Sequence, residues 1–519
     1  MAVYTFSPVS SGIDFISIPT SSTYPTSVEV SGWGFSLLAS SASVQMKTFQ
    51  PYVPVSPLPV VSTAQSGTVY NYITLAQMIQ QVANRLYDPT MTFWTQVELG
   101  YLIDEALQTW NALTSYWRGD FTFSAQPGVT WYDLTSPSQM PNTLRSYNVT
   151  DSALYTLMEY HLLEPAPTLN PINPWTGSLQ FSANDLLNAV QRRRDEILSI
   201  TGCTQSAFLV PASGSRVQLG DNVIDVRRIA YLPASVTGQP NVTLWPEDTW
   251  GEQSFNVDYT LTPPGSPSTY LLSTQPPLSF DTDVRAGFGG YFEMLTVNAG
   301  AALSVSAPSV LYIPDDWTHL LKWGALADLL SREWDAKDIP RADYCEKRYR
   351  LGLAAMLNAP ALLAMRMNNV PLQIDSVRAA DLYDAGWEST AAGAPTKCYH
   401  SGLNLIALAT VPDAGAYSLT ATVVQNAPLP ANFTVPVQVG RDDLDAIIDY
   451  AQHLAAFKMG GEEFFQTMPL FQRFLKQAAL YNGKLKEMAE YQIMLQDLSQ
   501  RERDMNPVTT PDSEQAATT

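Results

Sequence analysis

The sequence predicts an α+β fold, in which helical hairpin bundles alternate with β-hairpin and β-sandwich-like modules. Apolar residues recur at three- and four-residue steps in some segments and at two-residue steps in others, the periods of amphipathic helices and half-buried strands. The two kinds of segment follow each other in blocks, which argues against a doubly wound sheet. The chain has 519 residues and a hydrophobic fraction of 45%, so we expect three or four units, each with its own core.

Residues 1–70 are rich in Ser, Thr, Pro and Val and contain short alternating runs such as "SVEVSGWGF". Alternating runs are typical of strands, and the prolines of "PVSPLPVVSTA" stiffen an extended segment. We therefore expect a β-rich N-terminal arm or a small β domain here.

Residues 71–240 are predicted to contain a helix followed by a β-hairpin, twice. In the first copy, the apolar stripe of the helix at 92–114 includes Trp110, and Thr95 with Glu98 matches a capping box. The run "FTFSAQPGVTWYDLT" then has the two-residue period of a hairpin that turns at its Pro-Gly pair. A further helix is expected at about 151–163.

A shift of 87 positions places this helix and hairpin on a second set. Leu99 falls on Leu186, and Trp110 falls on Ile197 within the helix "FSANDLLNAVQRRRDEILSITG". "FLVPASGSRVQLGD" then repeats the strand, glycine turn and strand. The match indicates an internal duplication; two unrelated amphipathic helices are the alternative.

The rest of the chain continues the alternation. We expect β modules at 241–313 and 371–440, and helical hairpins at 314–370 and 441–505. Residues 506–519, rich in Thr, Ser and Pro, are expected to form a flexible tail.

The two downstream helical hairpins begin alike. Asp315–Asp316 and Asp442–Asp443 each precede an apolar helix, and a shift of 127 positions places Trp323 on Tyr450. Paired carboxylates can perform acid–base chemistry, but they also stabilise the positive end of a helix dipole. We favour the second interpretation, and we predict that Trp110 and Trp323 are buried.

The segment after Pro469 has the longest uninterrupted helical pattern. Pro469 suits a first helical turn, and Pro507 ends the pattern, so we expect a single rod that packs on the helix at 442–459 at one end. Along the rest we expect contact with a neighbouring subunit; a helix folded wholly onto its own chain is the alternative. The candidate subunit-interface residues lie at three- and four-residue steps: Phe471, Phe474, Tyr481, Leu485, Met488, Tyr491 and Leu495.

The sequence contains no recognisable catalytic or metal-binding motif. The four histidines do not pair at i, i+4, and Cys398 with His400 is the sole close pair, so we expect no metal and no cofactor. "AGFGGYF" lacks the Lys-Ser/Thr of a phosphate-binding loop and reads as a bulge or turn. We expect no catalytic residues and therefore no enzyme activity.

Arg192 to Arg194 form the main basic run. This run could contact nucleic acid, but Asp195 and Glu196 follow it on the same helix, so salt bridging is the favoured interpretation. The net charge of −20 argues against a surface that neutralises phosphates. We expect only non-specific contact with DNA.

Sequence features also indicate where the chain is made. It contains three cysteines, an odd number that suggests reduced thiols, and its first residues lack the basic and apolar regions of a signal peptide. No apolar run approaches the roughly 20 residues of a membrane helix. We expect synthesis in the host cytoplasm and no membrane partner.

Several segments together resemble virion structural proteins of tailed bacteriophages, most closely the neck or head-to-tail adaptor (connector) group. They are "FWTQVELGYLIDEALQTWNALTSYWRGDFTF", "TWYDLT", "VTDSALYTLMEYHLLEP", "SANDLLNAVQRRRDEIL" and "LYIPDDWTHLLKWGALADLLSREWDAKDIPRADYCEKRYRLGLAAML". The resemblance covers roughly residues 70–360, and the chain is longer than a typical small adaptor.

The resemblance implies a structural protein located in the virion neck or tail. Its partners would be the portal protein and the tail or neck proteins of the same virion, and it would form a homo-oligomeric ring through which DNA passes. The alternatives are a tail or baseplate structural component and a glycan-binding or glycan-degrading tail protein.

Overall fold

The computed structural model describes residues 71–495, except 136–145, 163–180, 213–215, 235–240, 256, 274–277, 300–301, 305–307, 334–336, 361, 385 and 390, together with residues 27–29 and 36–38. Its contacts divide the chain into two units, Met1–Thr68 and Val69–Thr519. In the first unit, strands β1 (Ser27–Glu29) and β2 (Ser36–Leu38) pair antiparallel. The tail expected at 506–519 lies outside the described residues.

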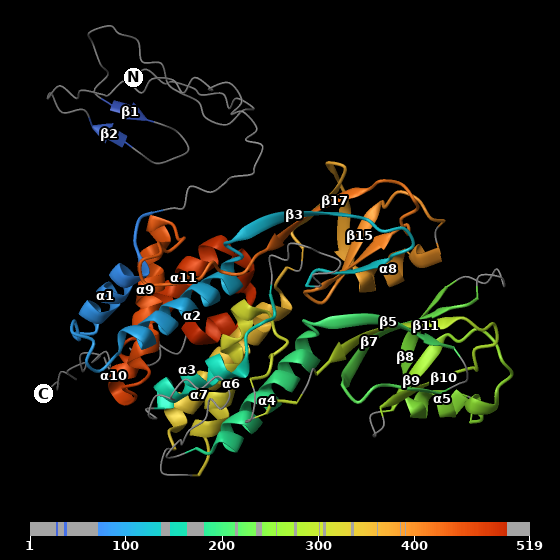
Figure 1. Cartoon of the computed structure of the whole chain (residues 1–519), viewed down its shortest axis with the longest axis horizontal. Coiled ribbons are helices and arrows are strands. Elements are labelled where there is room, and N and C mark those ends of the chain that lie inside the picture. The colour runs from blue at the N-terminus through green and yellow to red at the C-terminus, as the bar shows by residue number, and fades with distance from the viewer. Residues whose placement is uncertain are drawn as a thin grey trace, which may run out of the picture. The chain divides into compact units, whose positions relative to one another are not determined.

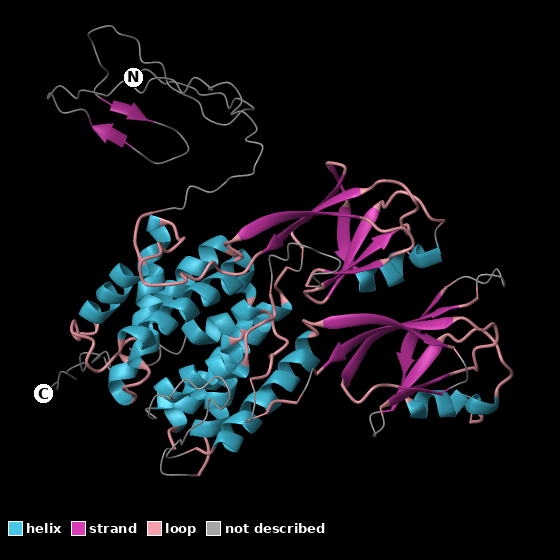
Figure 2. Cartoon of the chain, viewed as in Figure 1, coloured by secondary structure: helices cyan, strands magenta, loops and turns pink. Residues whose placement is uncertain are grey.

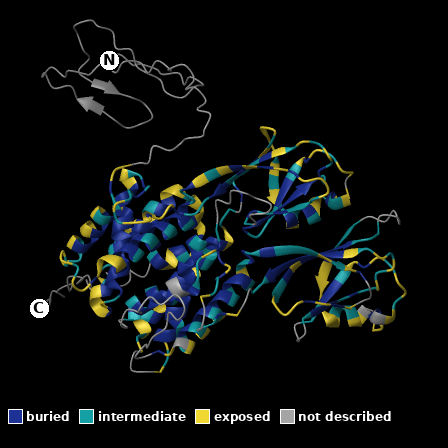
Figure 3. Cartoon of the chain, in the orientation of Figure 1, coloured by how far each residue is buried: buried dark blue, intermediate teal, exposed yellow. Residues whose placement is uncertain are grey.

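The second unit combines helices with several β-sheets, which confirms the predicted α+β class (Figures 1 and 2). Most of its helices surround one large apolar core, drawn dark blue in the left part of Figure 3. These helices are α1 (Leu75–Arg85), α2 (Gln96–Thr114), α3 (Asp151–Leu162), α4 (Ala183–Thr201), α6 (His319–Leu330), α7 (Ile339–Leu357), α9 (Arg441–Ala456), α10 (Gly461–Phe465) and α11 (Met468–Tyr481).

Local sequence explains where α2 and α4 begin and end. The Thr95 side chain accepts a hydrogen bond from the Glu98 backbone N–H, and Ser182 and Asp185 form a reciprocal capping box. Each helix ends at a residue in the left-handed conformation, Ser115 after α2 and Gly202 after α4. Each helix spans 19 residues and lies within its predicted segment, 92–114 for α2 and 181–202 for α4.

The predicted burial of two tryptophans is confirmed. Trp110 of α2 and Trp323 of α6 are 0% and 1% exposed. Trp110 packs against Phe474 and Tyr481 of α11, with ring centroids 5.6 and 5.5 Å away. Aromatic side chains thus fill the helical core instead of forming an exposed platform.

One group of strands, which we call module A, spans residues 205–298. Its seven strands are hydrogen-bonded in the order β5-β11-β7-β8-β9-β10-β6, and β8 joins its two halves because one end of β8 pairs with β7 and the other end with β9. The bounds are β5 (Gln205–Pro211), β6 (Arg216–Gln218), β7 (Val223–Leu232), β8 (Val242–Glu247), α5 (Thr249–Phe255), η2 (Tyr259–Leu261), β9 (Thr269–Ser273), β10 (Ser279–Thr282) and β11 (Tyr291–Asn298).

Module B combines two distant parts of the sequence, residues 118–133 and 364–424. Its two four-stranded sheets, β13-β12-β17-β3 and β14-β15-β16-β4, enclose a separate apolar core. The bounds are β3 (Arg118–Ser124), β4 (Trp131–Asp133), β12 (Ala364–Met367), β13 (Val370–Pro371), β14 (Gln373–Ser376), α8 (Val377–Tyr383), η4 (Trp387–Ser389), β15 (Lys397–Ser401), β16 (Leu405–Ala409) and β17 (Ser418–Val424).

Both predicted hairpins are wrong. β3 and β4 do not pair with each other; β3 pairs with β17, and β4 pairs with β16. In module A, β5 likewise pairs with β11, and β6 pairs with β10. The two-residue period identified strands and their faces correctly, but it carries no information about which strand is the partner. The predicted boundary at 240 is also crossed, since residues 118–133 belong with strands after 363.

The glycine run "AGFGGYF" lies where two backbone segments approach closely, which accounts for its glycine without a phosphate-binding loop. Gly290, at φ +94°, precedes β11, and a Cβ atom there would lie 2.0 Å from the carbonyl oxygen of Leu232. Only glycine fits this position.

The two modules share one strand order. A helix leads into each (α4 into module A, α2 into module B), and a parallel pair occurs at the same place, β8 with β9 and β14 with β15. The short strands β13 and β14 of module B occupy the position of the single strand β8 of module A.

Several matched elements of the two modules share sequence offsets. α2 and β3 lie 87 positions before α4 and β5, from 96 to 183 and from 118 to 205. β11 lies 127 positions before β17, and α5 lies 128 positions before α8. Register is also kept, because Tyr291 pairs with Pro211 and their counterparts Ser418 and Ser124 pair with each other.

Candidate functional site

The predicted subunit interface after Pro469 needs correction. α11 ends at Tyr481 instead of continuing as one rod, because Asn482 leaves the helical conformation and donates a hydrogen bond from Nδ2 to the Leu113 carbonyl. The short 3-10 turn η5 (Gly483–Glu487) follows, and a further helical stretch runs from 489 to 495. Residues of the expected rod after 495 lie outside the described part.

Most candidate interface residues are buried within their own chain. Phe471, Phe474, Leu485, Met488 and Tyr491 are 0 to 8% exposed and belong to the helical core, and Leu495 packs against it. This arrangement matches the alternative of a helix folded onto its own chain. Tyr481 is 48% exposed, and its hydroxyl donates a hydrogen bond to Asp443. Contact of α11 with α9 is as predicted.

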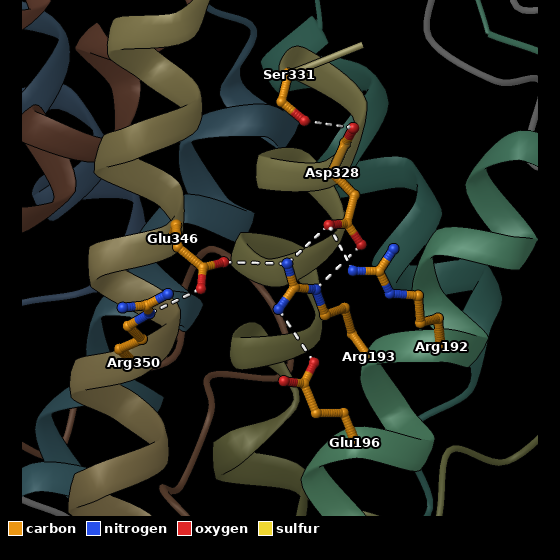
Figure 4. Close-up of polar contacts among 7 residues, drawn as sticks. All are labelled: Arg192, Arg193, Glu196, Asp328, Ser331, Glu346 and Arg350. Carbon is orange, nitrogen blue, oxygen red and sulfur yellow. Dashed lines mark hydrogen bonds and ion pairs between the residues drawn. The ribbon is translucent and has the colours of Figure 1, made fainter.

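Arginines of the basic run form ion pairs inside the chain. The side chain of Arg193 is 8% exposed and contacts Asp328, Glu346 and Glu196 at 2.7, 3.0 and 3.1 Å (Figure 4). Arg194 is fully buried, whereas Arg192 is largely exposed. A run so engaged with carboxylates cannot offer three cations to a phosphate backbone, so the salt-bridge interpretation fits the structure.

The paired aspartates serve as structural acceptors. Asp315 accepts hydrogen bonds from the backbone N–H groups of Asn148 and Val149, and Asp316 accepts one from Asn111 Nδ2 at 2.6 Å. These contacts tie the start of α6 to neighbouring segments. They occupy the carboxylates that acid–base chemistry would need free.

A polar network lies inside the helical core. The Lys322 ammonium contacts Glu105, and it lies 2.9 Å from His161 Nε2. Burial lowers the pKa of Lys322 and keeps the pKa of His161 well below its ordinary value, so the imidazole is neutral. Both side chains are shielded from solvent, which makes this network a structural one.

Cys398 and His400, the one close pair in the sequence, both lie on β15. Burial raises the pKa of the Cys398 thiol to about 12, so it stays protonated. Across the described residues, no group of three or more His, Cys, Asp or Glu side chains could hold a metal ion.

His400 lines a cavity of about 260 Å³ with Cys203, Ser376, Arg378 and Ser401. This volume is below the roughly 300 Å³ at which small-molecule pockets begin. Burial also raises the pKa of the Cys203 thiol, so the cavity contains no activated thiolate.

The contact between modules A and B is the most elaborate polar arrangement at a module surface. Arg228 of β7 pairs with Asp381 of α8 at 2.8 Å, with Glu388 of η4 at 2.8 Å and with Glu293 of β11 at 3.0 Å. Its guanidinium also lies over the Trp387 ring, 5.6 Å from the centroid. The four charged side chains are at most 10% exposed.

This arrangement contains three carboxylates and one guanidinium. Burial and the nearby Glu388 raise the pKa of Glu293 to about 8, so this group holds a proton near neutral pH. A proton on Glu293 reduces the excess negative charge that the interface must bury.

An apolar cluster surrounds the Arg228 contact. Leu295 of β11 shares it with Tyr399, Leu405 and Ala407 of module B and with Ala380 of α8. We call this side of module A, formed by β5, β11 and β7, the covered face. α8 lies between it and the sheets of module B (Figure 1).

Module B carries a counterpart of the covered face, which we call the open face. It is the outer side of β3, β17 and β12, and its residues are exposed or half-exposed: Asp120, Thr122, Ala364, Arg366, Thr420 and Thr422. By register, Ala364 occupies the place of Arg228, and Thr420 occupies that of Glu293.

We call the side of module B formed by α8 and η4 the α8 side. Its counterpart in module A is formed by α5 and η2, and we call it the α5 side; α5 lies on module A away from the covered face (Figure 1). This segment carries three of the most exposed large apolar side chains in the described chain: Trp250 (84%), Val257 (78%) and Leu261 (78%).

The sequence contains no signal for the contact between modules A and B. Arg228 stands in "IDVRRIAYL", where a strand pattern with two arginines gives no sign that one is buried. Asp381 and Glu388 lie far away in the sequence, and only the strand pairing reveals that they converge.

Comparison with protein-family models and with curated proteins finds no match for the chain. Among the described residues, no helix is long and apolar enough to span a membrane.

Proposed function

We propose that the protein is a structural component of a tailed-phage virion, forming a neck or head-to-tail adaptor ring between the portal and the tail. The observation that carries the proposal is a succession of elements that occurs twice. A long helix leads into a β module, and the chain then continues as a pair of helices: α4, module A, α6 and α7 in one case, and α2, module B, α9 and α11 in the other. The likeness of the sequence to adaptor proteins supports the same conclusion.

The proposal includes an origin by duplication, with the second copy inserted into the first between β4 and β12. The shared strand order, the shared offsets of α2–β3 with α4–β5 and the matched register of β5–β11 and β3–β17 support it. A chain of this kind brings two equivalent modules to each position of a ring, so a ring of given size displays twice as many modules as subunits.

Charge supports a role next to passing DNA. The chain has 49 acidic and 29 basic residues, and its main basic run is engaged in ion pairs. An acidic lumen would let the phosphate backbone pass without trapping it, which agrees with only non-specific contact with DNA.

The exposed Trp250 favours a second candidate, a tail or baseplate component that binds glycans, since aromatic rings can stack on sugars. The buried aromatic side chains of the helical core argue for packing instead, and the carboxylates of Asp315 and Asp316 are occupied by structural hydrogen bonds.

Mass measurement of purified virions tests the proposal. We expect the chain to be present at a fixed copy number that corresponds to one ring per particle, in contact with portal or tail proteins after cross-linking. Absence from the particle would contradict it. Glycan hydrolysis by the purified protein, abolished by a single Asp or Glu substitution, would favour the enzyme alternative.

A further inference from the structure

Each module has one surface that the contact inside the chain does not use. Inside the chain, the α8 side of module B lies on the covered face of module A. Module A has its own α5 side and module B has its own open face, and neither takes part in this contact.

We propose that the α5 side of module A in one copy docks on the open face of module B in a second copy of this chain. The in-chain contact supplies the geometry, and the same backbone elements stand at both unused surfaces. The inference rests on the self-assembly part of the proposed function and names the surfaces that perform it.

Burial distinguishes the used from the unused surfaces. On the covered face Arg228, Ala230, Glu293 and Leu295 are buried. On the open face, Arg366 is exposed in the same strand position as the buried Ala230. The face with buried residues is the one that module B covers within the chain.

The α5 side has a composition suited to a partner. Trp250, Val257 and Leu261 are among the most exposed large apolar side chains of the described residues, and aromatic anchors of this kind dominate protein interfaces. In the in-chain contact, the Arg228 guanidinium of module A lies over the Trp387 ring of the counterpart segment η4.

The charges are arranged alike in the contact inside the chain and in the proposed contact between copies. In the chain, an arginine on the strands faces carboxylates on the helix, as Arg228 faces Asp381. Between copies, Arg366 on the open face would meet the acidic segment around α5, which includes Glu247, Asp248 and Glu252. Burial raises the pKa of Glu252, and the neighbouring Asp283 and Glu247 raise it further; a nearby cation would relieve the repulsion from these two carboxylates.

The proposed contact joins two different surfaces, so it is heterologous. Such contacts repeat from copy to copy, and they close into a ring when the rotation between copies permits, or otherwise form a filament. A ring built this way would continue the A–B stacking of one chain into the next.

Cysteine cross-linking tests the proposal. Gln253 of α5 is the counterpart of Asp381, and Ala364 of β12 is the counterpart of Arg228, so cysteines at these two positions should meet between copies. The native Cys203, Cys345 and Cys398 are buried, so a short bifunctional maleimide should react with the introduced thiols.

We expect the purified Gln253→Cys, Ala364→Cys protein to give a ladder of covalent oligomers. The control replaces the first position by Leu480→Cys, a 70% exposed site on α11, and should give no ladder. A ladder of equal strength in the control, or none in the test protein, would overturn the proposal.

Charge reversal provides a second measurement. Arg366→Glu should weaken self-association by about tenfold or more in analytical ultracentrifugation, equivalent to about 1.4 kcal/mol. Lys476→Glu, an exposed site on α11, is the matched control and should leave it unchanged.

Different results would contradict the proposed virion ring and the proposed docking surfaces. If oligomers form but neither the cross-link nor Arg366→Glu affects them as expected, the proposed surfaces are wrong and the ring proposal stands. If the chain occurs in no virion but cross-links through these surfaces, the assembly inference stands and the phage role is wrong.

Discussion

Modules A and B have one strand order and one register but bury different side chains on equivalent faces. At the same position of the sheet, module A carries Arg228 and module B carries Ala364; one step away, Glu293 corresponds to Thr420. The charged pair lies where the other module covers the sheet, and the small and hydroxyl side chains lie where solvent reaches it. The difference shows that the backbone repeat fixes where a contact can form, while the side chains decide what covers it.

The same comparison holds in the helical core. Trp110 of α2 and Ile197 of α4 are equivalent, and both are fully buried, but Trp110 packs against three aromatic rings: Tyr116, Phe474 and Tyr481. The two helices therefore fill these matched positions with side chains of different volume, and substitutions there should have unequal effects on stability.

The largest expected effect is at Trp110. Replacing Trp110 by Ala should destabilise the protein by about 3–5 kcal/mol, since it removes a buried aromatic side chain and leaves a cavity. Ile197→Val, which removes one methyl group at the equivalent position, should cost about 0.5–1.5 kcal/mol. Urea unfolding followed by circular dichroism measures both. Trp250→Ala is the exposed control, and equal losses in all three variants would show that the helical core is not arranged as described.

The second-largest loss of stability is expected at the contact between modules A and B. Arg228→Ala leaves Asp381, Glu388 and Glu293 without their shared cation, and breaking such a buried pair should cost about 3 kcal/mol. On the open face, Arg366→Ala should change stability by at most about 0.5 kcal/mol. Thermal unfolding of the monomeric state compares the two. Similar losses would mean that the two faces are equally covered.

The smallest expected effect is a difference in pH dependence. The raised pKa of Glu293 means that its folded form holds a proton that the unfolded chain loses above its ordinary pKa, near 4.5. The stability from this group is therefore present below pH 4.5 and is lost as the pH rises towards about 8.

Glu293→Gln should accordingly flatten the decline of melting temperature between pH 5 and 8, by the equivalent of roughly 1–2 kcal/mol. The variant Thr420→Ser, at the counterpart position in module B, should keep the wild-type slope because no titrating group is involved. If Glu293→Gln and wild type decline in parallel, Glu293 is ionised in the folded protein, and the account of its environment is wrong.

No sequence pattern distinguishes the covered face from the open face. Both appear as strands with alternating apolar residues, and arginines occur in each: Arg227 and Arg228 in β7, Arg366 in β12. Burial of Arg228 depends on α8, which is more than 140 residues away in the sequence (residue 228 to residue 377). No local pattern records such a contact.

By itself, the sequence determined the α+β class, the limits of α2 and α4, the burial of Trp110 and Trp323 and the offsets of 87 and 127 positions. These features depend on caps and on periodic apolar residues, which act within a few residues of one another. The tertiary structure alone decided that β3 pairs with β17 instead of β4, that α11 stops at Tyr481, and that Arg228 is surrounded by carboxylates. These outcomes depend on contacts between distant segments, and a side-chain period specifies which face of an element is buried but not what buries it.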